Sequence, residues 1–177
     1  VGRFARDQSV STQDRVIHSA KSWLCHSGVD REAPMLPWSS DKITPANKLS
    51  PVETSAHFLD FLRFAWNRHQ SLTGLSAPFD EQAIVVTVPA SFDAVACKLT
   101  LDAAQMAGYP ESVRLLEEPQ AALYSWLSDH KDNRLWELLH EHAIASLLVC
   151  DIGGGTTDFS LFEVQKPRTD TRLPRIR

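Results

Sequence analysis

The stretch DIGGGTTD, residues 151–158, lies between the apolar runs ASLLVC and FSLFEV. Three consecutive glycines between two short apolar runs favour a β-hairpin, because glycine reaches the backbone conformations that tight turns require. Asp151 then ends one strand and Asp158 begins the next. The chain is therefore expected to contain a sheet with a glycine turn bordered by two carboxylates.

The glycine turn has the composition of a phosphate-binding loop. Gly153, Gly154 and Gly155 can direct their backbone N–H groups into one concave space that accepts an oxyanion, and Thr156 adds a hydroxyl donor. A turn with solvated aspartates is the simpler alternative, but the D…T-x-D pattern around the glycines favours phosphate binding. The sequence has neither the P-loop nor the dinucleotide-binding fingerprint.

The two aspartates beside this loop suit a magnesium ion. Mg²⁺ in phosphate sites usually takes one or two carboxylates and keeps several of its waters. Asp151 and Asp158 are therefore expected to hold Mg²⁺ next to the bound phosphate.

Upstream of the hairpin, helical and strand patterns alternate. Residues 51–69 predict a helix, with Ser50 as N-cap, Pro51 as first helical residue and Glu53 closing a capping box. Residues 83–89 and 112–118 read as strands, and the segments that begin at Asp93 and Glu118 read as helices. This order predicts an α/β fold with a mixed sheet.

The remaining segments are less regular. Residues 15–24 form an amphipathic stretch that predicts a helix, and residues 33–49, with three prolines, predict an irregular connection. A short helix is expected over 134–142, where the HEH motif at His140 and His142 is more typical of a polar helix face than of a metal site. The basic tail after residue 164 is expected to be a hairpin loop without its return strand.

Composition excludes several classes of function. The net charge of −4, from 18 basic and 22 acidic residues, is not what a nucleic-acid groove requires. No apolar run approaches the length of a membrane span, so no membrane partner is expected. Three widely spaced cysteines, Cys25, Cys97 and Cys150, indicate a reducing compartment, and we expect a cytoplasmic protein.

Longer motifs resemble the heat-shock protein 70 chaperones of the actin-like ATPase superfamily. DIGGGTTD resembles their second phosphate loop, and VVTVPASF…DAAQMAG…EEPQAALYSWL resembles their VPA-aromatic-F, D-A-x-x-A-G and N-E-P-x-A-A motifs. The opening VGRFARDQ…VIHSAKSWL is similar to the segment that carries the family's catalytic lysine. The EEP and AKSWL forms suggest a divergent bacterial branch.

The resemblance implies part of an actin-like, ribonuclease H-like nucleotide-binding domain, with a mixed sheet, flanking helices and a helical outer subdomain. Residues 1–78 match outer subdomain IB, residues 79–127 the second part of IA, 128–145 a polar connection and 146–177 the start of IIA. The family's first phosphate hairpin, its adenosine-clasping subdomain and its peptide-binding domain have no counterpart in these residues, so we expect a fragment.

The family's chemistry implies roles for individual residues. Lys21 matches the catalytic lysine at the γ-phosphate, where its charge offsets the negative charge that develops on the phosphate oxygens. Glu118 matches the glutamate that holds a metal-bound water or orients the nucleophile, although a carboxylate there also suits a helix N-terminus. Asp151 and Asp158 match the metal shell. The cofactors implied are ATP or ADP with Mg²⁺.

The resemblance also implies client polypeptides and co-chaperones as partners. Pro89 matches a proline of the family's interdomain relay. Cys97 replaces the relay arginine and Ser91 replaces the usual aromatic residue, so coupling to peptide binding is expected to be altered or lost.

Two other functions remain open from sequence. A bacterial actin-like cytoskeletal ATPase would share the EEP-x-A-A and DIGGGTT motifs, but not the lysine segment around Lys21. A non-catalytic nucleotide-binding scaffold would not need Lys21, Glu118, Asp151 and Asp158 together.

Overall fold

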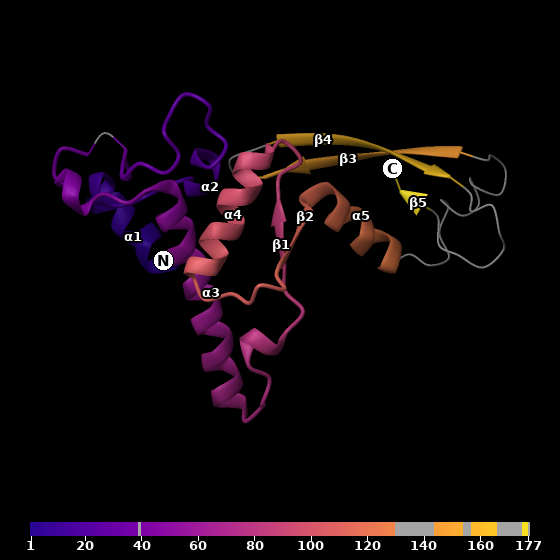
Figure 1. The fold of residues 1–177 in the computed structure, drawn as a ribbon, viewed down its shortest axis with the longest axis horizontal. Helices are drawn as coiled ribbons and strands as arrows, with labels where there is room; N and C mark the ends of the chain where they lie inside the picture. Colours follow the sequence, from indigo (N-terminus) through magenta and orange to yellow (C-terminus); the bar gives the residue numbers. More distant parts are fainter. Residues whose placement is uncertain (39, 130–143, 154–156, 166–174, 177) are drawn as a thin grey trace. The chain divides into compact units, whose positions relative to one another are not determined.

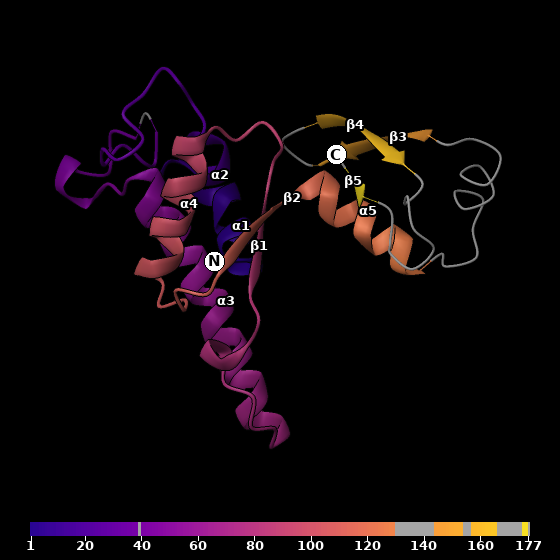
Figure 2. The same ribbon diagram turned by 45° about the vertical axis from the view of Figure 1, so that its right-hand side comes forward.

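The computed structural model describes residues 1–38, 40–129, 144–153, 157–165 and 175–176. The chain divides into two compact units, one made of residues 1–86 and 92–115 and the other of residues 87–91 and 116–177. Figures 1 and 2 show the elements of each unit. None of the described helices has the length and hydropathy needed to cross a membrane.

The first unit is organised by helix α3 (Pro51–Thr73), which confirms the predicted helix and extends it by one turn. The Ser50 side chain accepts a hydrogen bond from the Glu53 backbone N–H, and the Glu53 carboxylate accepts one from the Ser50 N–H. This is the predicted capping box. Gly74 ends the helix in the left-handed conformation, at φ 69°.

Helix α4 (Ala94–Met106) packs against α3, as Figure 1 shows, and begins at the predicted N-cap Asp93. The interface contains small side chains, which let the two helix backbones approach closely. Its buried residues are Leu24, Val52, Ala56, Leu99 and Ala103. Leu24 comes from the segment before the irregular connection, so this core joins three parts of the chain.

Most of residues 15–24, predicted as a helix, are not helical. Helix α1 (Arg3–Ser11) and the 3₁₀ turn η1 (Gln13–Arg15) precede an extended stretch, and helix α2 contains only Ala20–Trp23. The β-branched residues Val16 and Ile17 favour extended backbone. Ser19, at φ 55° and ψ 34°, then turns the chain into α2.

The connection over 33–49 is irregular, as predicted. Leu36 and Leu49 form an isolated antiparallel bridge, the Leu36–Pro37 peptide bond is cis, and η2 (Pro45–Asn47) is a single 3₁₀ turn. A further 3₁₀ turn, η3 (Phe79–Glu81), follows α3.

The described strands form two sheets rather than one mixed sheet. Strands β1 (Val85–Val88) and β2 (Arg114–Glu117) pair with each other, while β3 (Ile144–Ile152), β4 (Thr157–Gln165) and β5 (Arg175–Ile176) form the second sheet. The α/β class is confirmed. The predicted hairpin is also confirmed, because β3 and β4 are antiparallel neighbours.

The prediction that the return strand is missing was wrong. Strand β5 pairs with the end of β4, with Ile176 opposite Val164. Two residues of strand are too short to leave a periodicity that sequence reasoning could detect. The predicted helix over 134–142, with its HEH motif, lies outside the described residues.

Candidate functional site

The β3–β4 hairpin places the two predicted carboxylates directly opposite each other. Asp151 pairs with Asp158, and the last pair before the turn is Ile152 with Thr157. Directly opposite residues of an antiparallel pair project from the same face, with Cβ atoms about 4.5–5.5 Å apart. Gly153 lies outside the ladder and is exposed, while Gly154, Gly155 and Thr156 lie outside the described residues.

The carboxylates lie on the covered face of the hairpin. Alternation along the strands puts Asp151 on the same face as Leu147, and Asp158 on the same face as Phe162 and Val164. Val164 is fully buried, and Trp126 of helix α5 packs against it. The other face is open, with Phe159 68% exposed and Ile152 76% exposed. The two half-buried aspartates therefore share the face that α5 covers.

Helix α5 (Glu118–Asp129) brings the third predicted carboxylate to this unit. Glu118 is the first residue of the helix, where the sequence predicted its start, and it is half-buried. In Figures 1 and 2 the N-terminal end of α5 lies toward the end of the hairpin where β3 ends and β4 begins. Trp126 and Leu127, near the other end of α5, contact Leu147 and Val164. Glu118 thus belongs to the end of α5 nearer Asp151.

The paired aspartates suit a divalent cation. Like charges placed opposite each other in a ladder destabilise the hairpin unless they are neutralised, and Mg²⁺ accepts two carboxylates while keeping its waters. No group of three or more His, Cys, Asp or Glu side chains within the described residues is arranged to hold a metal by itself.

Lys21 lies in the other unit, on the four-residue helix α2. Its own side chain is exposed, but its neighbours hold the helix firmly, since Ala20 is 2% exposed and Leu24 is 3% exposed. Leu24 packs into the α3–α4 core. The backbone of Lys21 therefore has a defined place in its unit, and its catalytic role stays a prediction.

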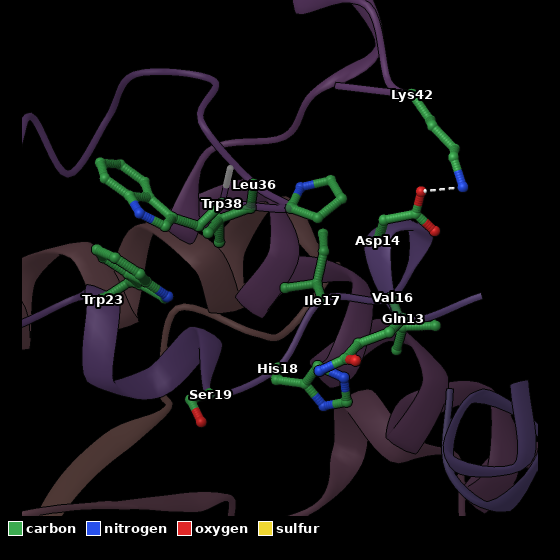
Figure 3. A pocket seen from close by; sticks show the side chains of 11 residues that line it. Gln13, Asp14, Val16, Ile17, His18, Ser19, Trp23, Leu36, Trp38 and Lys42 are labelled. Atoms are coloured by element: carbon green, nitrogen blue, oxygen red, sulfur yellow. Dashed lines mark ion pairs between the residues drawn. The ribbon is translucent and has the colours of Figure 1, made fainter. Parts of the chain in front are cut away.

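Sequence reasoning did not anticipate a cavity in the first unit that is lined by the segments 13–23 and 36–42. Figure 3 shows this cavity of about 740 Å³, in which the Trp23 and Trp38 rings stack with centroids 4.9 Å apart. Lys42 donates a 2.8 Å hydrogen bond to Asp14 at the rim, and this bond lowers the pKa of the Asp14 carboxyl. Lys21 is not among the lining residues. The stacked tryptophans come from segments that share no local pattern, so their meeting left no sequence signal.

Comparison with known proteins follows the motifs. The sequence model of the family described as Hsp70 protein matches residues 1–170. Chaperone protein HscA of Cronobacter sakazakii is 35% identical over 176 residues, which is 94% of this chain and 26% of that protein. Chaperone protein HscA of Pectobacterium carotovorum is 32% identical with the same coverage, and the HscA homolog of Pseudoalteromonas atlantica is 34% identical over 94% of this chain and 25% of its own length.

The chain therefore spans about a quarter of the length of the curated relatives that it matches. The matched region includes both the segment around Lys21 and the glycine hairpin, and the hairpin motif alone would also fit bacterial actin-like cytoskeletal proteins. Motifs, hairpin geometry and family match agree: the chain belongs to the Hsp70 family.

Proposed function

We propose that residues 1–177 are part of the nucleotide-binding domain of a chaperone that binds ATP with Mg²⁺ and hydrolyses it. The observation that carries this proposal is the direct opposition of Asp151 and Asp158 beside the glycine turn, on the face that α5 covers. A turn that binds no phosphate or metal would not require two carboxylates to face each other, because that arrangement lowers the stability of the hairpin when no cation is bound.

The proposed site assigns a task to each group. Gly153, Gly154 and Gly155 supply backbone N–H donors to the phosphates, and Thr156 supplies a hydroxyl to the γ-phosphate. When bound, Mg²⁺ would neutralise phosphate charge. Its holders are Asp151, Asp158 and, through water, Glu118.

Lys21 provides the positive charge of the reaction. Attack of water on the γ-phosphate transfers negative charge onto oxygens, and a fixed ammonium group stabilises that distribution more than it stabilises bound ATP. Under this proposal Lys21 acts on turnover and much less on affinity.

Membership of the Hsp70 family supports a proposal about the domain around this site. We propose the actin-like arrangement of subdomains, with residues 1–78 as the outer part, 79–127 as the inner part, 128–145 as a connection and 146–177 beginning the second lobe. Hydrolysis would be coupled to folding of client polypeptides in the cytoplasm, with co-chaperones. Cys97 and Ser91 mark where this coupling departs from the family pattern.

Calorimetry with MgATP tests the site. In the full-length protein, replacing Asp151 with Asn weakens binding at least about tenfold, since a charge-assisted contact to the metal shell is lost. Asp80→Asn, an exposed carboxylate of η3, is the matched control and leaves affinity unchanged. Equal affinity of wild type and Asp151→Asn would refute the assigned metal site.

Of the nucleotide-contacting parts of the family, the resemblance places only the second phosphate hairpin within residues 1–177. We therefore expect weak or undetectable ATP binding by this chain in isolation, because the binding energy of the family's other nucleotide contacts is lost. Micromolar affinity of the isolated chain would contradict this reasoning. Binding without turnover in the full-length protein would instead identify the non-catalytic scaffold.

A further inference from the structure

One ion pair of the first unit differs from the others in geometry and burial. The Arg31 guanidinium donates two parallel hydrogen bonds to the Asp93 carboxylate, at 2.9 and 3.0 Å. The Arg31 side chain is 14% exposed, whereas the Lys98 side chain in the Lys98–Asp102 pair on α4 is 71% exposed. The Asp93 side chain is 52% exposed, so the shielding concerns the guanidinium. A bidentate pair with a shielded guanidinium still fixes geometry better than an exposed lysine pair.

Asp93 is also the N-cap of α4. Its carboxylate accepts a 2.6 Å hydrogen bond from the Ala96 backbone N–H while it receives the Arg31 fork. Arg31 is thereby hydrogen-bonded to the N-cap of α4. Further along this helix, Leu99 and Ala103 are buried in the core.

The other end of the Arg31 contact reaches the Lys21 helix. The Arg31 Nε–H donates to the His26 carbonyl at 3.3 Å. Turn-type backbone hydrogen bonds connect α2 to His26: Leu24 donates to the Lys21 carbonyl and His26 donates to the Trp23 carbonyl. Arg31 therefore ties the C-terminal end of the Lys21 segment to α4.

The N-terminal end of the same segment follows a residue in an unfavourable backbone conformation. Ser19 adopts the left-handed conformation, which residues other than glycine, asparagine and aspartate adopt rarely, and it immediately precedes α2. Such strain persists only where surrounding structure over-determines the backbone. The Lys21 helix thus follows directly on the left-handed Ser19, and it is anchored at its end by Leu24 and after it by Arg31.

We propose that Arg31 is a positioning residue for Lys21: its bonds to the His26 carbonyl and to Asp93 fix the α2 segment on helix α4, so that the Lys21 ammonium is presented in one place. This inference rests on the proposed function of Lys21. The proposal does not require Arg31 itself to contact the nucleotide.

Two sets of measurements on the full-length protein test the proposal. Amide hydrogen exchange follows residues 20–26 in wild type, Arg31→Ala, Arg31→Lys, Asp93→Ser and Lys98→Ala, and steady-state ATP hydrolysis gives kcat and KM for the same proteins. Serine preserves the N-cap while removing the carboxylate, and lysine preserves the charge while removing the fork. Lys98→Ala breaks the exposed pair on the same helix and is the control.

Expected results are local and specific. Arg31→Ala and Asp93→Ser raise exchange over 20–26 at least about tenfold, because the segment opens more often, while exchange over α3 is unchanged. The same variants lower kcat about tenfold with KM within about twofold, since displacement of a catalytic group by about 1 Å costs up to about 100-fold. Arg31→Lys has nearly the same exchange and kcat as Arg31→Ala. The double variant Arg31→Ala/Asp93→Ser, measured in the same way, shows no larger effect than either single variant, and Lys98→Ala resembles wild type.

Unchanged exchange over 20–26 in Arg31→Ala would overturn the proposal, as would multiplication of the two single effects in the double variant. Normal turnover by Lys21→Ala would refute the proposed function instead. Exchange distinguishes these failures because it does not depend on ATP chemistry.

Discussion

The opposed aspartates make a quantitative prediction about the hairpin. Two unit charges about 5 Å apart, which is the Cβ spacing of a directly opposite pair, repel each other by about 0.8 kcal/mol in water and by about 3 kcal/mol at an effective dielectric constant of about 20. Asp151 and Asp158 are half-buried, and measured cross-strand charge pairs are worth up to about 1 kcal/mol. In buffer without divalent cations, Asp158→Asn should therefore stabilise the 177-residue chain by about 1 kcal/mol, which corresponds to about 2–4 °C in thermal midpoint.

Added magnesium should make wild type at least as stable as Asp158→Asn. Added Mg²⁺ offsets the repulsion in wild type and raises its midpoint, while Asp158→Asn, with one carboxylate left opposite an amide, gains little. Thermal unfolding with MgCl₂, compared with NaCl at the same ionic strength, separates specific binding from screening. Asp80→Asn is the matched control. A variant less stable than wild type without Mg²⁺, or an equal response of both to Mg²⁺, would refute the reasoning.

Three further predictions concern the unit that carries Lys21. Leu24→Ala should lower the free energy of unfolding by about 2–5 kcal/mol in urea titration, since the side chain is buried in the α3–α4 core; a loss below about 1 kcal/mol would contradict its anchoring role. Tyr109→Phe should cost about 0.5–1.5 kcal/mol in the same titration, because the hydroxyl donates to the Leu59 carbonyl at 3.2 Å, and an unchanged midpoint would argue against that bond. The hydrogen bonds from Arg31 lower the pKa of Asp93, so the stability that the pair supplies is complete above pH about 4 and is lost as the pH falls through the folded-state pKa. The difference in thermal midpoint between wild type and Arg31→Ala should accordingly shrink below pH about 4, and a difference that stays constant from pH 6 to 3 would exclude the ion pair as its source.

Features that depend on near neighbours in sequence could be predicted. The capping box of Ser50 and Glu53 requires only residues three apart, and the N-cap at Asp93 requires only the first turn of its helix. The opposition of Asp151 and Asp158 follows from strand alternation once the turn length is known. These elements were correct because local chemistry decides them.

Features decided by distant contacts could not be predicted. The amphipathic pattern around Val16 suggested a helix, but the observed backbone is extended there and the left-handed Ser19 delays α2. Arg31 meets Asp93 across 62 positions, and neither residue carries a motif that indicates the other. Lys21 was identified by family resemblance, whereas the device that holds it became visible only through these tertiary contacts.

Single-turnover hydrolysis of ATP by the full-length protein, with wild type and Lys21→Ala compared at saturating MgATP, tests the proposed ATPase function most directly. Because the ammonium is expected to act on the transition state, Lys21→Ala should slow the chemical step about 100-fold or more while nucleotide affinity changes by no more than about threefold. Hydrolysis by Lys21→Ala at the wild-type rate would contradict the account.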